Sequence, residues 1–267
     1  MSVSPLIIAH RGASAHAPEN TLSAFRMAVD AGADGIEFDV QLAKDGVPVV
    51  IHDPRLDRTG LRSGNVSDFT SKELAEFDVG TWFNAKYPKR SNSDFARESI
   101  PTLTQTLQML ETFCGLIYIE LKTDKADFHK LTKAVCDIVR DSPLFARIIL
   151  KSFTPAAIPD IRHQLPDVQT AALFGHTIMD LLRRRQTIIT IAGELGADQI
   201  SLHHSLVTPK LISLATAAQL PVTIWTTDKP KWLSRCRKLG IRALITNDPI
   251  KLLNVEDKID FWNKKGG

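Results

Sequence analysis

The sequence predicts an α/β fold, more specifically a (β/α)8 barrel, and three observations lead to it. Short apolar runs alternate with amphipathic stretches of helical period, which is typical of a parallel sheet covered by helices. Nine such runs occur, at residues 6–10, 34–39, 47–52, 116–121, 147–153, 168–174, 198–203, 221–227 and 242–246. The second and third stand too close together to be neighbouring parallel strands, and removing one from nine leaves the eight of a barrel.

The close pair of runs is predicted to form a hairpin. Only residues 41–46 separate them, whereas a parallel crossover needs about a dozen residues or more. Lys44-Asp45-Gly46 is a good tight-turn signal. We expect the second strand to extend past the sheet and turn, so that the third run returns His52 toward the end that carries Glu37 and Asp39. In a barrel, active-site residues are expected at that C-terminal mouth.

The helical stretches follow the strands in the expected order. In residues 21–31, 102–113, 128–140 and 209–219, apolar side chains return at intervals of three and four. The first of these helices should begin at Asn20 or Thr21, either of which is a good N-cap, and Gly32 should end it.

Residues 54–100 interrupt the alternation. They are rich in Ser, Asn, Asp, Arg, Gly and Pro, with only short apolar clusters. We interpret them as an insertion between the second barrel strand and its helix, placed to wall a pocket at the barrel mouth. Residues 1–267 are otherwise expected to form a single domain.

Composition narrows the class of protein. With 33 basic and 30 acidic residues the formal charge is +3, which gives no reason to expect nucleic-acid binding or a polybasic membrane patch. The three cysteines are widely spaced and form neither a metal motif nor a disulfide framework, which indicates a reducing compartment. No long apolar segment or signal-type N-terminus is present, so we expect a cytoplasmic protein without membrane insertion. The oligomeric state stays open.

Four of the apolar runs break off into ionisable side chains of catalytic type. Buried strands have no structural use for such residues at their ends, and fully buried charges are rare unless paired. Four occurrences in one chain therefore indicate a shared site. The junctions carry His10-Arg11, Glu37 with Asp39, His52-Asp53, and Glu120 with Lys122.

The carboxylates in this set favour a metal site. Glu37 and Asp39 are two residues apart, so on a strand they point to the same face. Such a pair repels unless a positive charge lies between, and Mg²⁺ or Ca²⁺ is the usual solution, with Glu120 as a third oxygen ligand. Lys122 shares the face of Glu120 and would either neutralise it or reach a substrate anion. An ordinary cluster of salt bridges is the alternative.

The remaining groups favour phosphodiester cleavage. His10 and His52 both exchange protons near neutral pH, and a reaction that deprotonates one oxygen while protonating another needs two such groups. Arg11 offers a planar fork suited to phosphate oxygens, although pairing with Glu19 is an alternative. A cation, these basic groups and two histidines would stabilise charge on phosphoryl oxygens and move the protons.

The motifs closely resemble those of the glycerophosphodiester phosphodiesterases, and the resemblance extends over essentially the whole chain. It implies a TIM barrel with a small insertion after the second histidine. It further implies hydrolysis of glycerophosphodiesters to sn-glycerol 3-phosphate and an alcohol, with Mg²⁺ or Ca²⁺ as cofactor. The motifs are His10-Arg11-Gly12, Pro18-Glu19-Asn20-Thr21, Gly35-Ile36-Glu37-Phe38-Asp39-Val40, Lys44-Asp45-Gly46, His52-Asp53, Ile119-Glu120-Leu121-Lys122, Ser152-Phe153, Ile224-Trp225-Thr226 and residues 240–249.

Carried over by position, the resemblance assigns roles to residues of this chain. His10 and His52 match the general acid and base. The metal ligands match Glu37, Asp39 and Glu120, and the phosphate-contacting positions match Arg11 and Lys122. Phe153 and Trp225 resemble an aromatic wall around the glycerol end of the substrate, with a barrel-core role as the alternative for each. After Trp225-Thr226 this chain departs from the family, because Thr227 and Asp228 replace an apolar residue and Asn.

Two rival functions keep the same fold. A lysophospholipase D would use this site on an acylated substrate, which requires a long apolar groove, and the polar character of residues 54–100 disfavours it. A barrel that only binds an anionic ligand would leave the two histidines idle.

Overall fold

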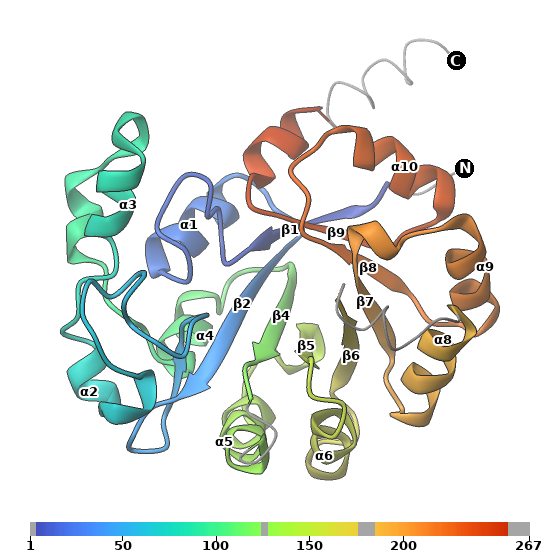
Figure 1. Cartoon of the computed structure of the whole chain (residues 1–267), viewed down its shortest axis with the longest axis horizontal. Coiled ribbons are helices and arrows are strands. Elements are labelled where there is room, and N and C mark those ends of the chain that lie inside the picture. The colour runs from blue at the N-terminus through green and yellow to red at the C-terminus, as the bar shows by residue number, and fades with distance from the viewer. Residues whose placement is uncertain (1–3, 124–127, 176–184, 256–267) are drawn as a thin grey trace.

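A closed barrel of eight parallel strands forms the centre of the computed structural model, which describes residues 4–123, 128–175 and 185–255 (Figure 1). Strand β1 pairs with both β2 and β9, and this closes the ring. The predicted fold is thus confirmed. The barrel strands are β1 (Leu6–His10), β2 (Gly35–Leu42), β4 (Leu116–Leu121), β5 (Ile148–Ser152), β6 (Gln169–Phe174), β7 (Gln199–His203), β8 (Val222–Trp225) and β9 (Ala243–Thr246).

The ninth strand, β3 (Pro48–Val50), runs antiparallel to β2, as the short connection predicts. Its ladder pairs Val40 with Val50 and Leu42 with Pro48. Strand β2 continues past its last pairing with β4, at Val40, to Leu42, and it is therefore longer than the apolar run that predicted it. The hairpin returns the chain to the barrel mouth just before His52.

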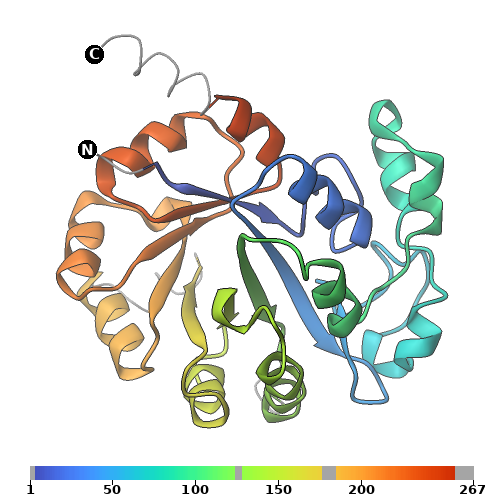
Figure 2. The same ribbon diagram turned by 180° about the vertical axis from the view of Figure 1, so that it is seen from behind.

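Helices surround the barrel on its outside, and the view from behind shows the same ring (Figures 1 and 2). Thr21 is the N-cap of the first helix, and its side chain accepts a hydrogen bond from the amide of Ala24. All four stretches singled out by their period contain a helix. The described surrounding helices are α1 (Leu22–Asp30), α4 (Leu103–Met109), α5 (Phe128–Arg140), α6 (Ala157–Gln164), α8 (Arg185–Glu194), α9 (Pro209–Ala217) and α10 (Lys231–Leu239).

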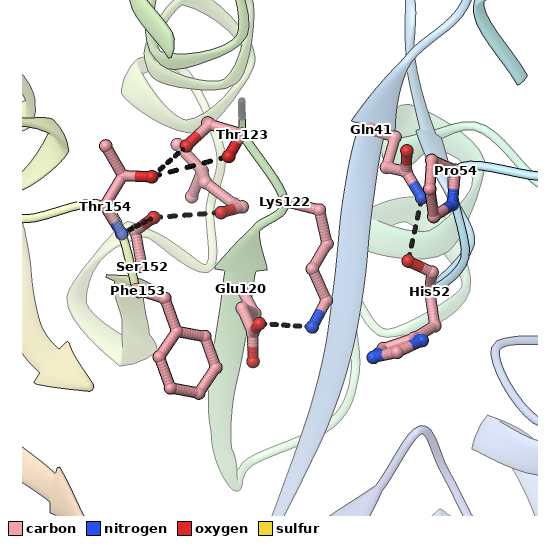
Figure 3. A pocket seen from close by; sticks show the side chains of 10 residues that line it. Gln41, His52, Pro54, Glu120, Lys122, Thr123, Ser152, Phe153 and Thr154 are labelled. Atoms are coloured by element: carbon pink, nitrogen blue, oxygen red, sulfur yellow. Dashed lines mark hydrogen bonds and ion pairs between the residues drawn. The ribbon is translucent and has the colours of Figure 1, made fainter. Parts of the chain in front are cut away.

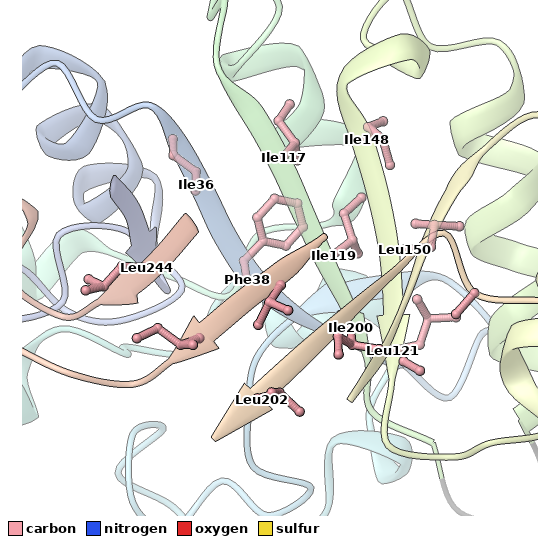
Figure 4. Close-up of a cluster of buried hydrophobic side chains, with 14 of the residues drawn as sticks. Ile36, Phe38, Ile117, Ile119, Leu121, Ile148, Leu150, Ile200, Leu202 and Leu244 are labelled. Atoms are coloured by element: carbon pink, nitrogen blue, oxygen red, sulfur yellow. The ribbon is translucent and has the colours of Figure 1, made fainter. Parts of the chain in front are cut away.

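The alternation of side chains along each strand builds two different layers. Residues that point outward, such as Phe38, Ile119 and Leu150, are buried apolar side chains in the large cluster between sheet and helices (Figure 4). A smaller apolar cluster, which includes Ile8 and Tyr118, fills the inside of the barrel. Next to this inner cluster, toward the carboxyl ends of the strands, the inward positions become charged.

Residues 54–100 lie between β3 and α4, beside α1 (Figure 1). They contain only short helices: η1 (Val66–Asp68), α2 (Ser71–Leu74), α3 (Thr81–Lys86), η2 (Pro88–Arg90) and η3 (Ser93–Arg97). Two small apolar clusters anchor the segment, one including Leu56 and Leu74 and the other joining Phe83 to Ala24 of α1. Both ends of the domain predicted over 1–267 lie outside the described residues.

Gly12 packs the loop after β1 directly against α1, and this predicts a stability effect. Its φ is +78°, and an added Cβ would lie 2.5 Å from the carbonyl carbon of Ala24. Gly12→Ala should therefore lower the free energy of unfolding by about 2–5 kcal/mol, measured by urea denaturation, since conformational strain adds to a steric clash. Gly46→Ala is the matched control: its φ is also +78° but no atom lies within 4 Å, so only about 1–2 kcal/mol is expected. Equal losses in the two variants would contradict this account.

Candidate active site

The strand register brings the predicted site residues together at the carboxyl ends of β1, β2 and β4. His10 lies beside Glu37 in the pairing of β1 with β2. Two residues further along β2, Asp39 lies beside Glu120 of β4. The ionisable side chains at these three strand ends therefore face one another across a few ångströms.

The three carboxylates form one buried cluster. Glu37, Asp39 and Glu120 each offer an oxygen, and these atoms all lie within 4.8 Å of one another. All three residues are buried. Charges of one sign at this distance and depth need compensation from nearby cations.

Three cations supply that compensation. Lys122 Nζ lies 3.2 Å from Asp39 Oδ1 and also forms an ion pair with Glu120 Oε1. Arg11 Nε lies 3.1 Å from the other oxygen of Asp39, Oδ2. Lys151, on β5, reaches the cluster from inside the barrel, with Nζ 2.7 Å from Glu37 Oε1 and 3.6 Å from Glu120 Oε2. Three buried acids are thus matched by three bases.

The ion pairs shift the pKa values of the groups that form them. Burial alone would raise the pKa of Asp39, but Lys122 and Arg11 outweigh it and hold that pKa far below its usual value. The pKa of Glu37 is lowered against burial by Lys151. Burial would lower the pKa of Lys151, yet Glu37 and Glu120 raise it above its usual value. At neutral pH these groups are charged.

His10 is anchored through one ring nitrogen. Its Nδ1 lies 2.7 Å from Asn247 Oδ1, while its Nε2 lies 3.9 Å from Glu37 Oε2. Asp228 fixes the amide, because Asn247 Nδ2 donates to Asp228 Oδ2 over 3.0 Å. The amide oxygen therefore faces His10, so Nδ1 carries the proton and the lone pair of the ring lies on Nε2. Burial lowers the pKa of His10. Asp228 thus supports the site despite departing from the family pattern.

His52 is anchored by a chain of charged groups. Its Nδ1 lies 2.6 Å from Asp53 Oδ1. The other oxygen of Asp53 pairs with Arg58, which also donates two hydrogen bonds of 2.8 Å to Glu19. Glu19 in turn accepts a 2.7 Å bond from Arg11 Nη1. The predicted alternative for Arg11, pairing with Glu19, is therefore present together with its contact to Asp39.

Part of the site borders a cavity of about 350 Å³, whereas His10, Arg11, Glu37 and Asp39 are not among its lining residues. His52, Glu120, Lys122 and Phe153 line it, and Figure 3 shows Lys122 reaching toward Glu120 with His52 facing the same space. The exposed ring of Phe153 meets Trp225 edge to face, with centroids 5.5 Å apart. Trp225 is not among the lining residues and contributes through this contact.

Several residues of the site were not identified from the sequence. Lys151 stands inside the apolar run 147–153, two residues from the inward-facing Ile149. A lysine that shares the inward face of a buried strand with Ile149 was the sequence feature that could have identified it. Asn247 lies within residues 240–249, a segment that shares the family resemblance, but nothing local links it to His10.

A (β/α)8 barrel whose mouth combines two histidines, three carboxylates and partly exposed basic side chains is consistent with a phosphate-ester hydrolase. Comparison with known proteins gives the family. The model of the glycerophosphoryl diester phosphodiesterase family matches residues 10–251. The chain therefore belongs to this family, and its activity is that of a glycerophosphodiester phosphodiesterase.

Individual relatives agree over nearly full length. A glycerophosphodiester phosphodiesterase of Caldanaerobacter subterraneus is 32% identical, with 95% of this chain and 98% of the relative covered. One of Bacillus subtilis is 31% identical, with coverage of 91% and 84%. Among solved structures, a phosphodiesterase of Oleispira antarctica in complex with the product sn-glycerol-3-phosphate aligns with a TM-score of 0.83 at 25% identity, covering 95% of this chain and 97% of the other. None of the described helices has the length and apolar character to cross a membrane.

The charge cluster predicts how stability responds to acid. Because the pKa values of Glu37 and Asp39 are lowered in the folded protein, their contribution is present at neutral pH and is lost as the pH falls below about 4.5, the ordinary value for Glu. Each carboxylate contributes up to about 1.4 kcal/mol per pH unit to this slope. We expect Asp39→Asn, measured in the presence of a chelator, to lose less unfolding free energy per pH unit than the wild type as the pH is lowered below about 4.5. Asp94→Asn, which removes an exposed ion pair with Arg97, should leave the slope unchanged, and identical slopes for all three proteins would refute the interpretation.

Proposed function

We propose that this enzyme hydrolyses glycerophosphodiesters to sn-glycerol 3-phosphate and an alcohol, in a divalent-cation-dependent reaction with two-histidine acid and base catalysis. The observation that carries the proposal is the buried carboxylate cluster with His10 beside it at the barrel mouth. The Oleispira antarctica structure, described as a complex with sn-glycerol-3-phosphate, supports the choice of product. Deacylated phospholipids such as glycerophosphocholine and glycerophosphoethanolamine are the proposed substrates.

The carboxylate cluster fits a hard divalent cation. Its donor atoms are all oxygens, which suits Mg²⁺ or Ca²⁺. Glu120 Oε1 accepts no well-aligned hydrogen bond, although Lys122 is in ion-pair contact with it. Glu37, Asp39 and Glu120 would hold the cation. When bound, the cation would polarise a phosphoryl oxygen and stabilise its developing charge.

The other side chains would bind the phosphate and move the protons. Arg11 and Lys122 are partly exposed at the mouth, where their donors suit the two non-bridging oxygens of a diester. With Nδ1 anchored in both histidines, Nε2 is the working atom of each. One Nε2 would accept a proton from the oxygen nucleophile that attacks phosphorus, while the other would donate a proton to the departing alcohol oxygen.

Phe153 and Trp225 are proposed to contact the apolar face of the glycerol unit. Their edge-to-face contact holds the Phe153 ring at the cavity wall. Lys122 Nζ lies 5.9 Å from the centre of that ring, so the glycerol and phosphate positions would be adjacent.

We further propose a single catalytic domain and a reducing, cytoplasmic setting. One closed sheet organises the described chain outside residues 54–100. Cys114, Cys136 and Cys236 form no disulfide with one another, which supports a compartment in which thiols stay reduced.

Substrate choice is tested with two substrates. Purified enzyme should release sn-glycerol 3-phosphate from glycerophosphocholine and should be far less active on lysophosphatidylcholine, because the cavity has several polar lining residues, including Gln41 and Thr123. A clear preference for the acylated compound would instead establish the lysophospholipase D alternative.

Removing the metal should abolish turnover reversibly. After dialysis against EDTA, activity should fall to background and return on addition of Mg²⁺ or Ca²⁺. Asp39→Asn should raise the cation concentration needed for half-maximal activity by about tenfold or more, since a charged ligand is lost. Full activity in the chelator would rule out the cation requirement.

Replacing either histidine should stop the chemistry while the fold survives. His10→Ala and His52→Ala should each lower kcat by about 10²–10⁴-fold, the usual contribution of a general acid or base. Circular dichroism and calorimetric titration with the cation should resemble the wild type. His129→Ala, a change at a histidine whose side chain is 68% exposed on α5, serves as control. Wild-type kcat in either active-site variant would contradict the proposed roles.

A further inference from the structure

Lys151 is the most deeply buried cation of the site. It lies on β5 at the level of Glu120, and its side chain is 2% exposed. Its ammonium group contacts two of the three clustered carboxylates, at 2.7 Å from Glu37 and 3.6 Å from Glu120. Burying an isolated ammonium group costs several kcal/mol, so these contacts are what keep it there.

The other two cations of the cluster differ from Lys151 in their access to the mouth. The side chains of Lys122 and Arg11 are 22% and 16% exposed. They can turn from Asp39 to an incoming phosphate. Lys151 is almost fully buried, and its ion-pair partners Glu37 and Glu120 both belong to the cluster, so its charge stays beside them whatever binds at the mouth.

We propose that Lys151 is a permanent counter-charge that keeps the carboxylate cluster stable without a divalent cation and thereby weakens the binding of that cation. The inference rests on the cation site proposed above. Any interaction that stabilises the cation-free state more than the bound state lowers the affinity for the ligand. With a divalent cation present, Lys151 would share Glu37 and Glu120 with it, and two positive charges this close repel strongly in a buried site.

A purely positioning role for Lys151 makes the opposite prediction. By holding Glu37 Oε1, Lys151 leaves Glu37 Oε2 facing the side of His10, at 3.9 Å from its Nε2. If this orientation were its main contribution, removing Lys151 would misplace a ligand and weaken cation binding. The sign of the change in affinity therefore separates the two roles.

The experiment compares cation affinity in variants at this position. Wild type, Lys151→Met and Lys151→Gln are stripped with EDTA, and Mg²⁺ and Ca²⁺ are titrated separately by calorimetry without substrate. We expect Kd to fall by about tenfold or more in both variants. We also expect a lower Tm than wild type in the chelator and a larger rise in Tm on adding the cation. Lys133→Met removes a lysine from an exposed ion pair with Asp137 on α5 and should leave Kd unchanged.

Each outcome decides the proposal. The proposal would be overturned if a variant has a Kd for the cation equal to or higher than that of the wild type. This holds for a variant whose Tm in the presence of the cation reaches that of the wild type. If Lys151→Met does not fold in the chelator, the affinity of Lys151→Gln, which retains a hydrogen-bond donor, is decisive. If the wild type binds neither Mg²⁺ nor Ca²⁺, the proposed cation site is itself wrong. If the wild type binds a cation and the Lys151 variants bind it no more tightly, only the role proposed for Lys151 is wrong.

Discussion

The balance of charge inside the barrel mouth is the constraint on which the rest of the site depends. Glu37, Asp39 and Glu120 converge within 4.8 Å in buried positions, and such a cluster is tolerable only with matching cations. Lys122, Arg11 and Lys151 provide them from three different directions. The charge of the acidic cluster is therefore compensated by side chains of the same chain, drawn from β5 and from the segments that follow β1 and β4.

Strand alternation explains how one barrel carries this charge and an apolar core together. Along β2, Glu37 and Asp39 point inward while Ile36 and Phe38 pack against the helices. The same alternation on β5 sends Ile149 and Lys151 inward. A register shift of one residue in either strand would bury the charges against the helices, so the large outer core also fixes the register that assembles the site.

Features that depend on the local spacing of apolar and polar residues could be predicted from the sequence. Features that depend on packing across the barrel could not. The strands, the β2–β3 hairpin and the shared face of Glu37 and Asp39 all follow from spacing. Lys151 could not be assigned to the site from the sequence. The spacing along β5 shows that Lys151 shares a face with Ile149, but not which side chains of other strands that face meets. The contact of His10 with Asn247 spans 237 positions, and only closure of the barrel through the β1–β9 pairing brings the two together.

The two histidines are anchored by groups of different charge, and the charge balance gives a physical reason. His10 lies against Glu37 inside a cluster whose acids and bases already match. A carboxylate at its Nδ1 would add an uncompensated negative charge there, whereas the amide of Asn247 fixes the ring without one. The charge of Asp228 is placed one residue further away, where it orients that amide. His52 lies closer to solvent and is held by Asp53, which pairs with Arg58, a cation that it shares with Glu19. The more deeply buried histidine is thus fixed by a neutral partner, and the more exposed one by a charged partner.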